Sequence, residues 1–89
     1  MKNDNRYYST LFRVFVFMNI MDAFYDNDYV YLENIERDGY SELSDIDKRH
    51  IIKQLKNGMD SWKLDPIGMT MLLDFIKRHD VNDTEDIEL

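Results

Sequence analysis

Apolar residues recur at helical spacing between positions 51 and 62. The positions concerned are Ile51, Ile52, Leu55, Met59 and Trp62. Steps of one, three, four and three residues place them on one face of a helix. Ser44 precedes this segment as a favourable N-cap, and Asp45 and Asp47 occupy the first turn, where the helix dipole favours acids. The pattern predicts a helix that begins after Ser44.

A second helical pattern follows Asp65-Pro66, an N-cap followed by proline at the first helical position. Its apolar stripe consists of Met69, Leu72, Leu73 and Ile76. The basic residues Lys77, Arg78 and His79 close the segment, where the negative end of the helix dipole favours positive charge. We therefore expect this helix to end near residue 79.

Residues 7–25 are apolar and contain neither glycine nor proline. Ser9 or Thr10 is a suitable N-cap. The run 14–17 has high β propensity, so a strand competes with a helix, but the length of the segment favours the helix.

On a helical wheel this first segment is apolar on two sides. One broad face contains Leu11, Val14, Phe15, Met18, Met21 and Tyr25, and another contains Phe17, Ile20 and Phe24. A helix that is apolar on two sides is either central in the fold or shared with a partner. The pattern therefore favours a dimer or a heteromeric contact, and a homodimer through the first helix is one hypothesis.

Residues 26–43 admit two interpretations. The sequence 26–28 is a turn signal, 29–32 reads as a short strand, Asp38-Gly39 is a hairpin-type turn, and 40–43 supplies the return strand. The alternative is a helix over 29–37 that ends at Gly39. The sequence alone does not decide between ribbon and helix.

Together these elements predict a mainly α protein, a small helical bundle of about three helices, to which the ribbon interpretation adds a short β-hairpin between the first and second helices. Residues 1–80 are expected to form a single compact helical domain, and 81–89 an acidic, flexible C-terminal tail. Cysteine is absent, so the core depends on packing alone.

The 89-residue chain carries a net charge of −7, which repels phosphate backbones and argues against nucleic acid as a partner. The absence of cysteine is compatible with a reducing cytoplasm, and we expect a cytoplasmic protein. Arg13, Asn19 and Asp22 interrupt the first apolar segment. We therefore expect neither a signal peptide nor a membrane span.

No catalytic, cofactor or metal motif stands out, and the sequence predicts a non-enzymatic protein without a cofactor. Residues 34–45 fit an EF-hand frame only in part, because Asn34 replaces the first acid and Asp45 the bidentate glutamate. His50 lies among basic residues, and His79 lies at a helix C-terminus where an imidazolium is favoured. Structural roles explain both histidines.

Charge is distributed unevenly along the chain. Nine acids and one base lie between Asp22 and Asp47. Tyrosines are interleaved with these acids, and tyrosine is enriched at interface hot spots, while carboxylates steer a basic partner. The residues expected to bind a basic protein are Asp26, Asp28, Tyr29, Tyr31, Glu33, Glu36, Asp38, Tyr40 and Glu42.

In size, acidity, lack of cysteine and richness in Asn, Asp, Tyr and Ile, the chain resembles small phage-encoded inhibitors of host or defence proteins. Some of those act as nucleic-acid mimics. The resemblance is one of composition and assigns no role to any residue of this sequence.

The leading hypothesis is therefore an acidic inhibitor that binds the basic groove of a nuclease, CRISPR effector or polymerase and blocks access of nucleic acid. One alternative is an immunity or antitoxin protein that neutralises a basic toxin. Another is a small helical DNA-binding regulator that uses the basic helix 48–63. Its phosphate contacts would come from Lys48, Arg49, Lys53 and Lys56.

Overall fold

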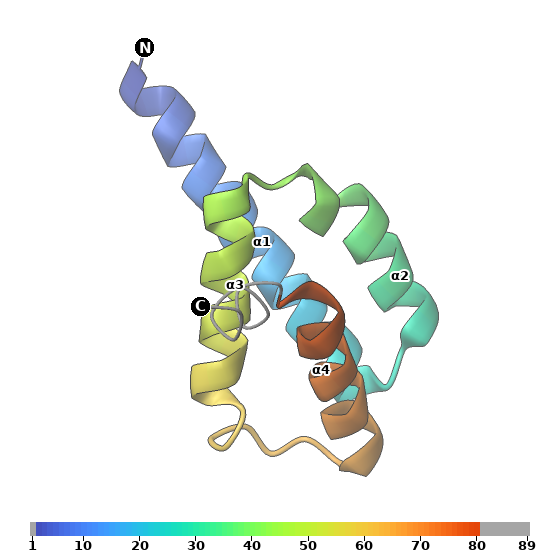
Figure 1. Cartoon of the computed structure of the whole chain (residues 1–89). Coiled ribbons are helices and arrows are strands. Elements are labelled where there is room, and N and C mark those ends of the chain that lie inside the picture. The colour runs from blue at the N-terminus through green and yellow to red at the C-terminus, as the bar shows by residue number, and fades with distance from the viewer. Residues whose placement is uncertain (1, 81–89) are drawn as a thin grey trace.

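The structure, a computed structural model, describes the backbone of residues 2–80 and the side chains of residues 8–80. Over this range the chain forms four α-helices and one short 3-10 helix, arranged as a bundle around α1 (Figure 1). The helices are α1 Lys2–Asp26, α2 Tyr29–Asp38, η1 Tyr40–Glu42, α3 Asp45–Gly58 and α4 Pro66–His79. Residues 2–80 contain no strand, so the prediction of a mainly α protein is confirmed.

The α1 helix is the central element and packs against α2, α3 and α4. It comprises 25 residues, a length of about 37 Å at the usual rise, and its first turns extend beyond the other helices (Figure 1). Neither Ser9 nor Thr10 is the N-cap, because the helix already includes Lys2.

The predicted β-hairpin between the first and second long helices is wrong. A tight turn at Asn27, which adopts a positive φ of 55°, is followed directly by α2. Asp28 is the N-cap, and its side chain accepts a hydrogen bond of 3.0 Å from the Tyr31 N–H. The helix ends at Gly39, whose N–H donates to the Ile35 carbonyl. The alternative interpretation of residues 29–37 as a helix is the correct one, and it raises the expected count of three helices to four.

The proposed return strand 40–43 instead forms η1 and the bend that leads into α3. Tyr40 is only 4% exposed, and its ring lies edge-on to Phe75 at a centroid distance of 5.2 Å. Burial of this one large ring holds the segment against the bundle. On the edge of a free hairpin, the Tyr40 ring would have been exposed to solvent.

The two capping predictions for the later helices are confirmed. The Ser44 side chain accepts a hydrogen bond from the Asp47 N–H at 3.2 Å at the start of α3. The Asp65 side chain accepts a bond of 2.7 Å from the Gly68 N–H at the start of α4. The α3 helix ends at Gly58, so Trp62 lies in the connection to α4, half-buried against Phe17.

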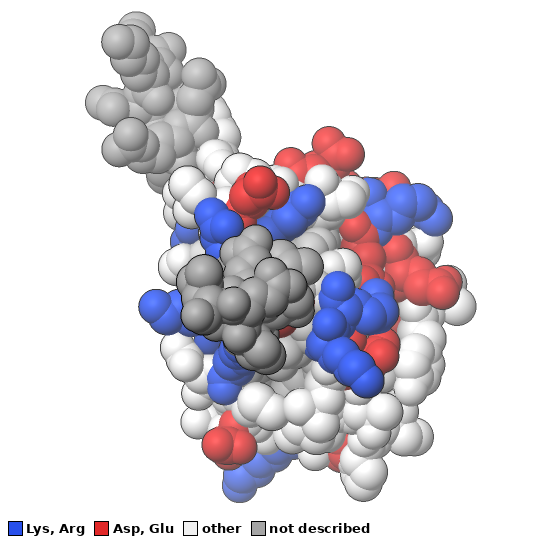
Figure 2. All heavy atoms as spheres, viewed as in Figure 1, with Lys and Arg blue, Asp and Glu red and all other residues white. Residues whose placement is uncertain are grey.

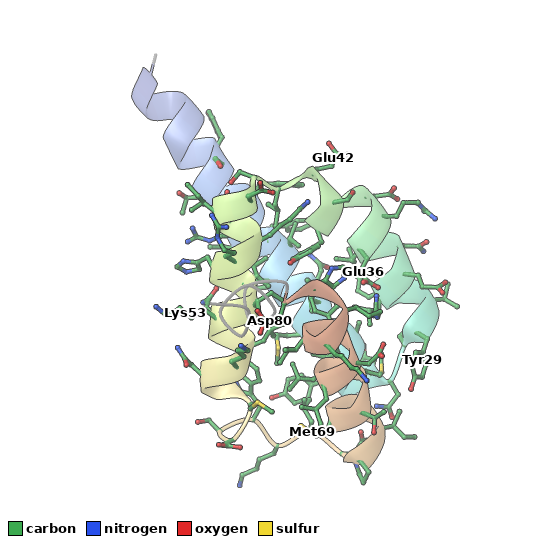
Figure 3. The ribbon with its side chains drawn as sticks, in the orientation of Figure 1. Tyr29, Glu36, Glu42, Lys53, Met69 and Asp80 are labelled. Atoms are coloured by element: carbon green, nitrogen blue, oxygen red, sulfur yellow. The ribbon has the colours of Figure 1, made fainter. Side chains whose placement is uncertain are left out.

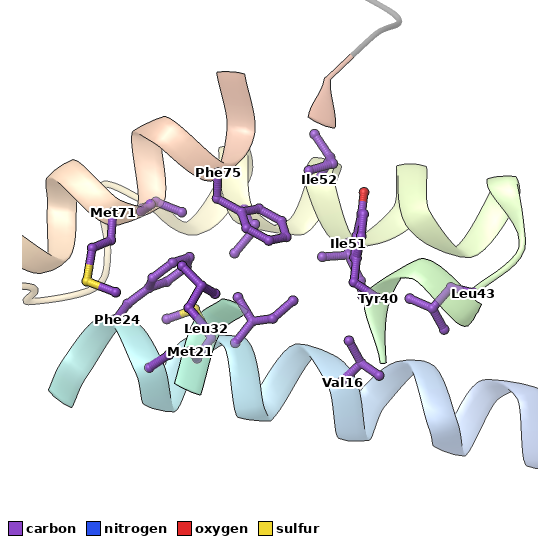
Figure 4. Close-up of a cluster of buried hydrophobic side chains, with 14 residues drawn as sticks. Val16, Met21, Phe24, Leu32, Tyr40, Leu43, Ile51, Ile52, Met71 and Phe75 are labelled. Carbon is purple, nitrogen blue, oxygen red and sulfur yellow. The ribbon is translucent and has the colours of Figure 1, made fainter. Parts of the chain in front are cut away.

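The core lies where the inner side of α1 meets the other helices (Figure 4). At its centre Phe24 and Phe75 are fully buried and stack edge to face, with centroids 6.2 Å apart. The buried residues around them are Val16, Ile20, Met21, Ala23, Leu32, Tyr40, Leu43, Ile51, Ile52, Leu55, Met71 and Leu72. Of the residues that the sequence placed on the broad apolar face of the first helix, Met21 is buried, whereas Phe15 and Met18 are exposed.

The first turn of α4 lies very close to the end of α1. A Cβ atom added at Gly68 would come within 2.5 Å of the Phe24 carbonyl oxygen. Glycine is therefore required at this position because the Phe24 backbone leaves no room for a side chain, and not because of its φ angle. This close approach fixes α4 against the core and, with it, the side chains that α4 presents to α2.

The acidic tail predicted over residues 81–89 lies outside the described residues. Within residues 2–80, none of the helices combines the length and the apolar character needed to cross a membrane.

Candidate functional site

The outer face of α2 presents acidic and aromatic side chains to solvent. Tyr29 is 55% exposed, and Glu33 lies one turn further along the same face, also exposed. Asp26 and Glu42 flank the helix and are exposed as well. Acidic side chains gather over this side of the molecule (Figure 2), and Tyr29 and Glu42 lie near the two ends of the α2–η1 segment (Figure 3).

Glu36 is turned toward α4 rather than toward solvent. Its carboxylate pairs with the Arg78 guanidinium, and its Oε2 lies 2.6 Å from the His79 Nε2. The Glu36 side chain is only 15% exposed. This predicted partner-binding residue therefore joins α2 to α4 within the molecule.

Three other predicted partner-binding residues are also engaged internally. The Tyr31 hydroxyl donates to the Asn19 side chain on α1, which fixes this tyrosine between the two helices. Tyr40 is buried in the core, and Asp28 caps α2. These three side chains hold the acidic segment against the rest of the bundle, although Asp28 is also exposed.

Asp38 remains on the surface but is paired with its neighbour. The Arg37 guanidinium donates to both oxygens of the Asp38 carboxylate, at 2.9 and 3.0 Å. This hydrogen bonding holds the pKa of Asp38 below its ordinary value. The pair neutralises the C-terminal end of α2, so the accessible negative charge lies nearer its N-terminal end.

A pocket of about 330 Å³ opens between α2 and α4 beside this charge. Its lining consists of Tyr29, Leu32, Glu33, Glu36, Met71, Asp74 and Arg78. Leu32 and Met71 are buried and give the pocket an apolar base, whereas Glu33 and Asp74 are exposed. Three carboxylates against one guanidinium make the pocket acidic.

Arg78 is held by two of those carboxylates. Its Nε donates to Asp74 at 2.8 Å, and its NH1 donates to Glu36. Burial opposes the charge of this guanidinium, but the two hydrogen bonds outweigh burial and raise the pKa of Arg78. Glu33 takes no part in these two hydrogen bonds, and its carboxylate interacts electrostatically with the Arg37 guanidinium one turn further along α2.

The sequence analysis did not identify the residues that α4 contributes to this pocket. Asp74 and Arg78 are four residues apart, a spacing that indicates an ion pair on one helix face. That signal was present in the sequence, but it does not say which other helix the pair faces. Only the packing of α4 beside α2 brings it to Glu36.

The basic face of α3 is partly engaged within the molecule. The Lys48 ammonium lies over the Tyr40 ring, 5.8 Å from its centroid, and Lys56 pairs with Asp80. Arg49 and Lys53 remain exposed. Residues 59–65 separate α3 from α4, a longer connection than the three or four residues typical of a helix-turn-helix.

The EF-hand frame over residues 34–45 falls on the end of α2, on η1 and on the start of α3. An EF-hand presents its ligands from a loop, whereas residues 34–38 are helical here. Among the described residues, no group of three His, Cys, Asp or Glu side chains is arranged to hold a metal ion.

Comparison with known proteins returned no match to this chain, whether among protein families, curated protein sequences or solved structures.

Proposed function

We propose that the protein is a non-enzymatic inhibitor that binds a basic protein through the N-terminal half of α2 and the pocket between α2 and α4. The observation that supports this is the composition of the pocket. An apolar base at Leu32 and Met71 lies beneath the exposed carboxylates of Glu33 and Asp74, beside the ring of Tyr29. This combination suits the side chain of an arginine or lysine.

Each part of a long basic side chain finds a suitable environment there. The methylene stem would contact Leu32 and Met71, because such stems pack on apolar surface while the charged end stays in water. The charged end would reach Glu33, with Asp74 nearby, and a planar guanidinium favours bidentate contact with a carboxylate. The Tyr29 ring adds a cation–π contact.

The surrounding charge extends this recognition beyond one side chain. Asp26 and Glu42 are exposed at either end of the same surface, and a surface of one sign accelerates encounter with a partner of the opposite sign. Grooves that hold nucleic acid are lined with basic residues for phosphate contact. A carboxylate-rich protein bound in such a groove would exclude the nucleic acid, which is the proposed mechanism for a nuclease, CRISPR effector or polymerase target.

Glu33→Lys tests this proposal most directly. Glu33 is exposed and lines the pocket, so its charge reversal changes recognition without removing a core contact. We expect the tagged wild-type protein to retain a basic nucleic-acid-binding enzyme from host lysate and to inhibit that purified enzyme on its substrate. The variant should lose both effects, and salt should weaken both by screening.

Asp60→Lys is the matched control. Asp60 is an exposed acid in the connection between α3 and α4, so the change in net charge is the same but lies away from the pocket. It should bind and inhibit like the wild type. If Glu33→Lys and Asp60→Lys retain the same proteins with the same salt sensitivity, the pocket is not the recognition site and the proposal fails.

The immunity or antitoxin alternative uses the same surface and differs only in the partner, so the identity of the retained protein separates the two. The DNA-binding alternative requires the bases of α3 to contact phosphates, and Arg49 and Lys53 are two of those that are exposed. A gel shift on mixed duplex DNA at low salt, repeated with Arg49→Glu, tests it. Retardation that this variant abolishes would favour the regulator over the inhibitor.

A further inference from the structure

A mostly apolar stripe runs along the outer side of α1, opposite the core. Its members are Tyr8, Leu11, Phe15, Met18, Asp22 and Tyr25. The intervals between them are three, four, three, four and three residues, the repeat that defines the contact seam of paired helices. Apart from Asp22 they are apolar or aromatic, and their exposed fractions range from 46% at Leu11 to 64% at Tyr8.

The stripe is distinct from the part of α1 that supports the fold. The core side of the helix contains Val16, Ile20 and Phe24, each no more than 1% exposed. Phe12 and Val14 border the stripe at 38% and 42% exposure. Monomeric proteins rarely leave so many large apolar side chains side by side in water, and such patches mark interaction sites.

From this pattern we propose that the outer stripe of α1 binds a second copy of the chain, with the two α1 helices antiparallel about a two-fold axis. The order of intervals is the same in both directions along the helix. A two-fold axis through the midpoint of the stripe therefore places each residue of the stripe opposite another residue of the stripe on the second copy. The axis passes between Phe15 and Met18. Each Phe15 then faces Met18 of the second copy, and each Tyr8 faces Tyr25 of the second copy.

The position of Asp22 selects the antiparallel arrangement. In a parallel pair the two Asp22 carboxylates would face each other within the seam, and like charges directly opposed are destabilising. In the antiparallel pair each Asp22 lies opposite Leu11, and the two carboxylates are separated along the axis by eleven residues, about 16 Å at the usual rise. The centre of the seam then holds Phe15 and Met18, whose thioether and ring make a favourable contact.

The surface area that these residues of α1 would bury on pairing is large enough for a small dimer interface. Aromatic side chains bury about 150–250 Å² each when fully covered. Four half-exposed aromatic rings, together with Leu11, Val14 and Met18, would therefore bury about 600 Å² on each copy. The pair would bury about 1,200 Å², the lower end of the range for specific interfaces.

The charge of the chain argues against other large occupants of this stripe. A net charge of −7 repels both anionic lipid surfaces and nucleic acid. A second copy carries the same charge, but Asp22 is the one acid among the six members of the stripe. Dimerisation through α1 is independent of the basic-partner proposal, which rests on the pocket between α2 and α4.

Sedimentation equilibrium of the full chain tests the proposal. We expect a mass twice the 10.8 kDa of one chain at high micromolar concentration, and 10.8 kDa for the double variant Phe15→Glu with Met18→Glu. Both replaced residues are exposed, so helical circular dichroism and thermal unfolding should remain those of a folded protein. Ile46→Glu, another exposed apolar residue but outside α1, is the control and should stay dimeric.

Because the chain contains no cysteine, crosslinking can report the direction of the pair. Leu11→Cys and Asp22→Cys should form a disulfide-linked dimer only when the two variants are mixed. Each variant alone should stay uncrosslinked under the same oxidation. Self-crosslinking of either variant would show a parallel pair and overturn the two-fold geometry.

A monomeric wild type at high concentration would overturn the proposal outright, as would a dimer that survives Phe15→Glu with Met18→Glu. Neither result affects the pocket, because Glu33→Lys tests it separately.

Discussion

The imidazole of His79 and the carboxylate of Glu36 are separated by 2.6 Å, from Nε2 to Oε2, and this contact joins the last turn of α4 to α2. Arg78 approaches the same carboxylate oxygen. One acidic side chain thus serves two bases that are neighbours in sequence but more than forty residues away from it. Glu36 contributes to the fold, whereas Glu33, three residues earlier, remains exposed.

We expect Glu36→Ala to lower the free energy of unfolding by about 1–2 kcal/mol, because it leaves Arg78 and His79 without their shared acceptor. Glu33→Ala should change it by no more than about 0.5 kcal/mol, as for most exposed positions. Urea unfolding followed by the fluorescence of Trp62, the only tryptophan, measures both. Equal losses for the two variants would contradict the distinction drawn between these acids.

Among the acids of α3, Asp47 should give the largest loss in the free energy of unfolding when it is replaced by alanine. It is 8% exposed, and its carboxylate accepts hydrogen bonds from the Ser9 hydroxyl at 3.2 Å and from the Arg13 NH1 at 3.3 Å. Asp47→Ala would leave Arg13 largely buried without this acceptor, and we expect a loss of about 2–3 kcal/mol. Asp45→Ala is the control, because Asp45 lies in the same first turn but is exposed. Its loss should stay within about 1 kcal/mol.

Gly68→Ala should destabilise the protein even though alanine is the better helix former. The new Cβ would lie 2.5 Å from the Phe24 carbonyl oxygen, a backbone atom that moves only with α1 itself. Overpacking of this kind costs about 1–3 kcal/mol, and the gain in helix propensity returns about 1 kcal/mol. We expect a net loss of up to about 2 kcal/mol in urea unfolding. Greater stability than the wild type would show that α1 and α4 are less tightly packed.

Alkaline pH should weaken the fold through Tyr40. Burial, reinforced by the nearby charges of Glu36 and Asp80, raises the pKa of Tyr40 from 10.0 to about 12. The folded state thus favours the neutral phenol. Its contribution to stability is complete below pH 10.0 and is lost as pH rises from there to about 12.

The measurement for Tyr40 is the free energy of unfolding at a series of alkaline pH values, compared with Tyr40→Phe. The phenylalanine ring preserves the contact with Phe75, and the hydroxyl makes only a long hydrogen bond of 3.5 Å to the Lys48 carbonyl. We expect the variant to be nearly as stable as the wild type at neutral pH and to lose less stability above pH 10.0. Parallel curves for the two proteins would show that another group controls alkaline unfolding.

The sequence predicted those elements whose signals are local. Ser44 and Asp65 act as caps where expected, because capping depends on the first turn of the helix alone. The segment after Asp28 was ambiguous because the apolar run over residues 29–32 is too short to distinguish a strand from a helix. Leu32 and Ile35 contact the core, and this contact favours the helix over the strand. It depends on tertiary packing, which the local sequence does not show.

The candidate site was predicted only in part for the same reason. The exposed acids Asp26, Glu33 and Glu42 lie where the charge pattern places them. That Tyr40 is buried and that Glu36 faces Arg78 follow from how η1 and α4 pack, and no local pattern encodes this. Met21 likewise shares the outer half of the helical wheel with Met18, yet a neighbouring helix covers only the first of the two.

The long α1 helix suits the protein as a scaffold for displaying a designed epitope. Its side chains at Leu11, Phe15 and Met18 are exposed while Val16, Ile20 and Phe24 anchor the same helix in the core. A library randomised at the outer positions would therefore vary a rigid helical surface without disturbing the residues that hold it. Selection from such a library could yield new binding specificities on an unchanged cysteine-free framework.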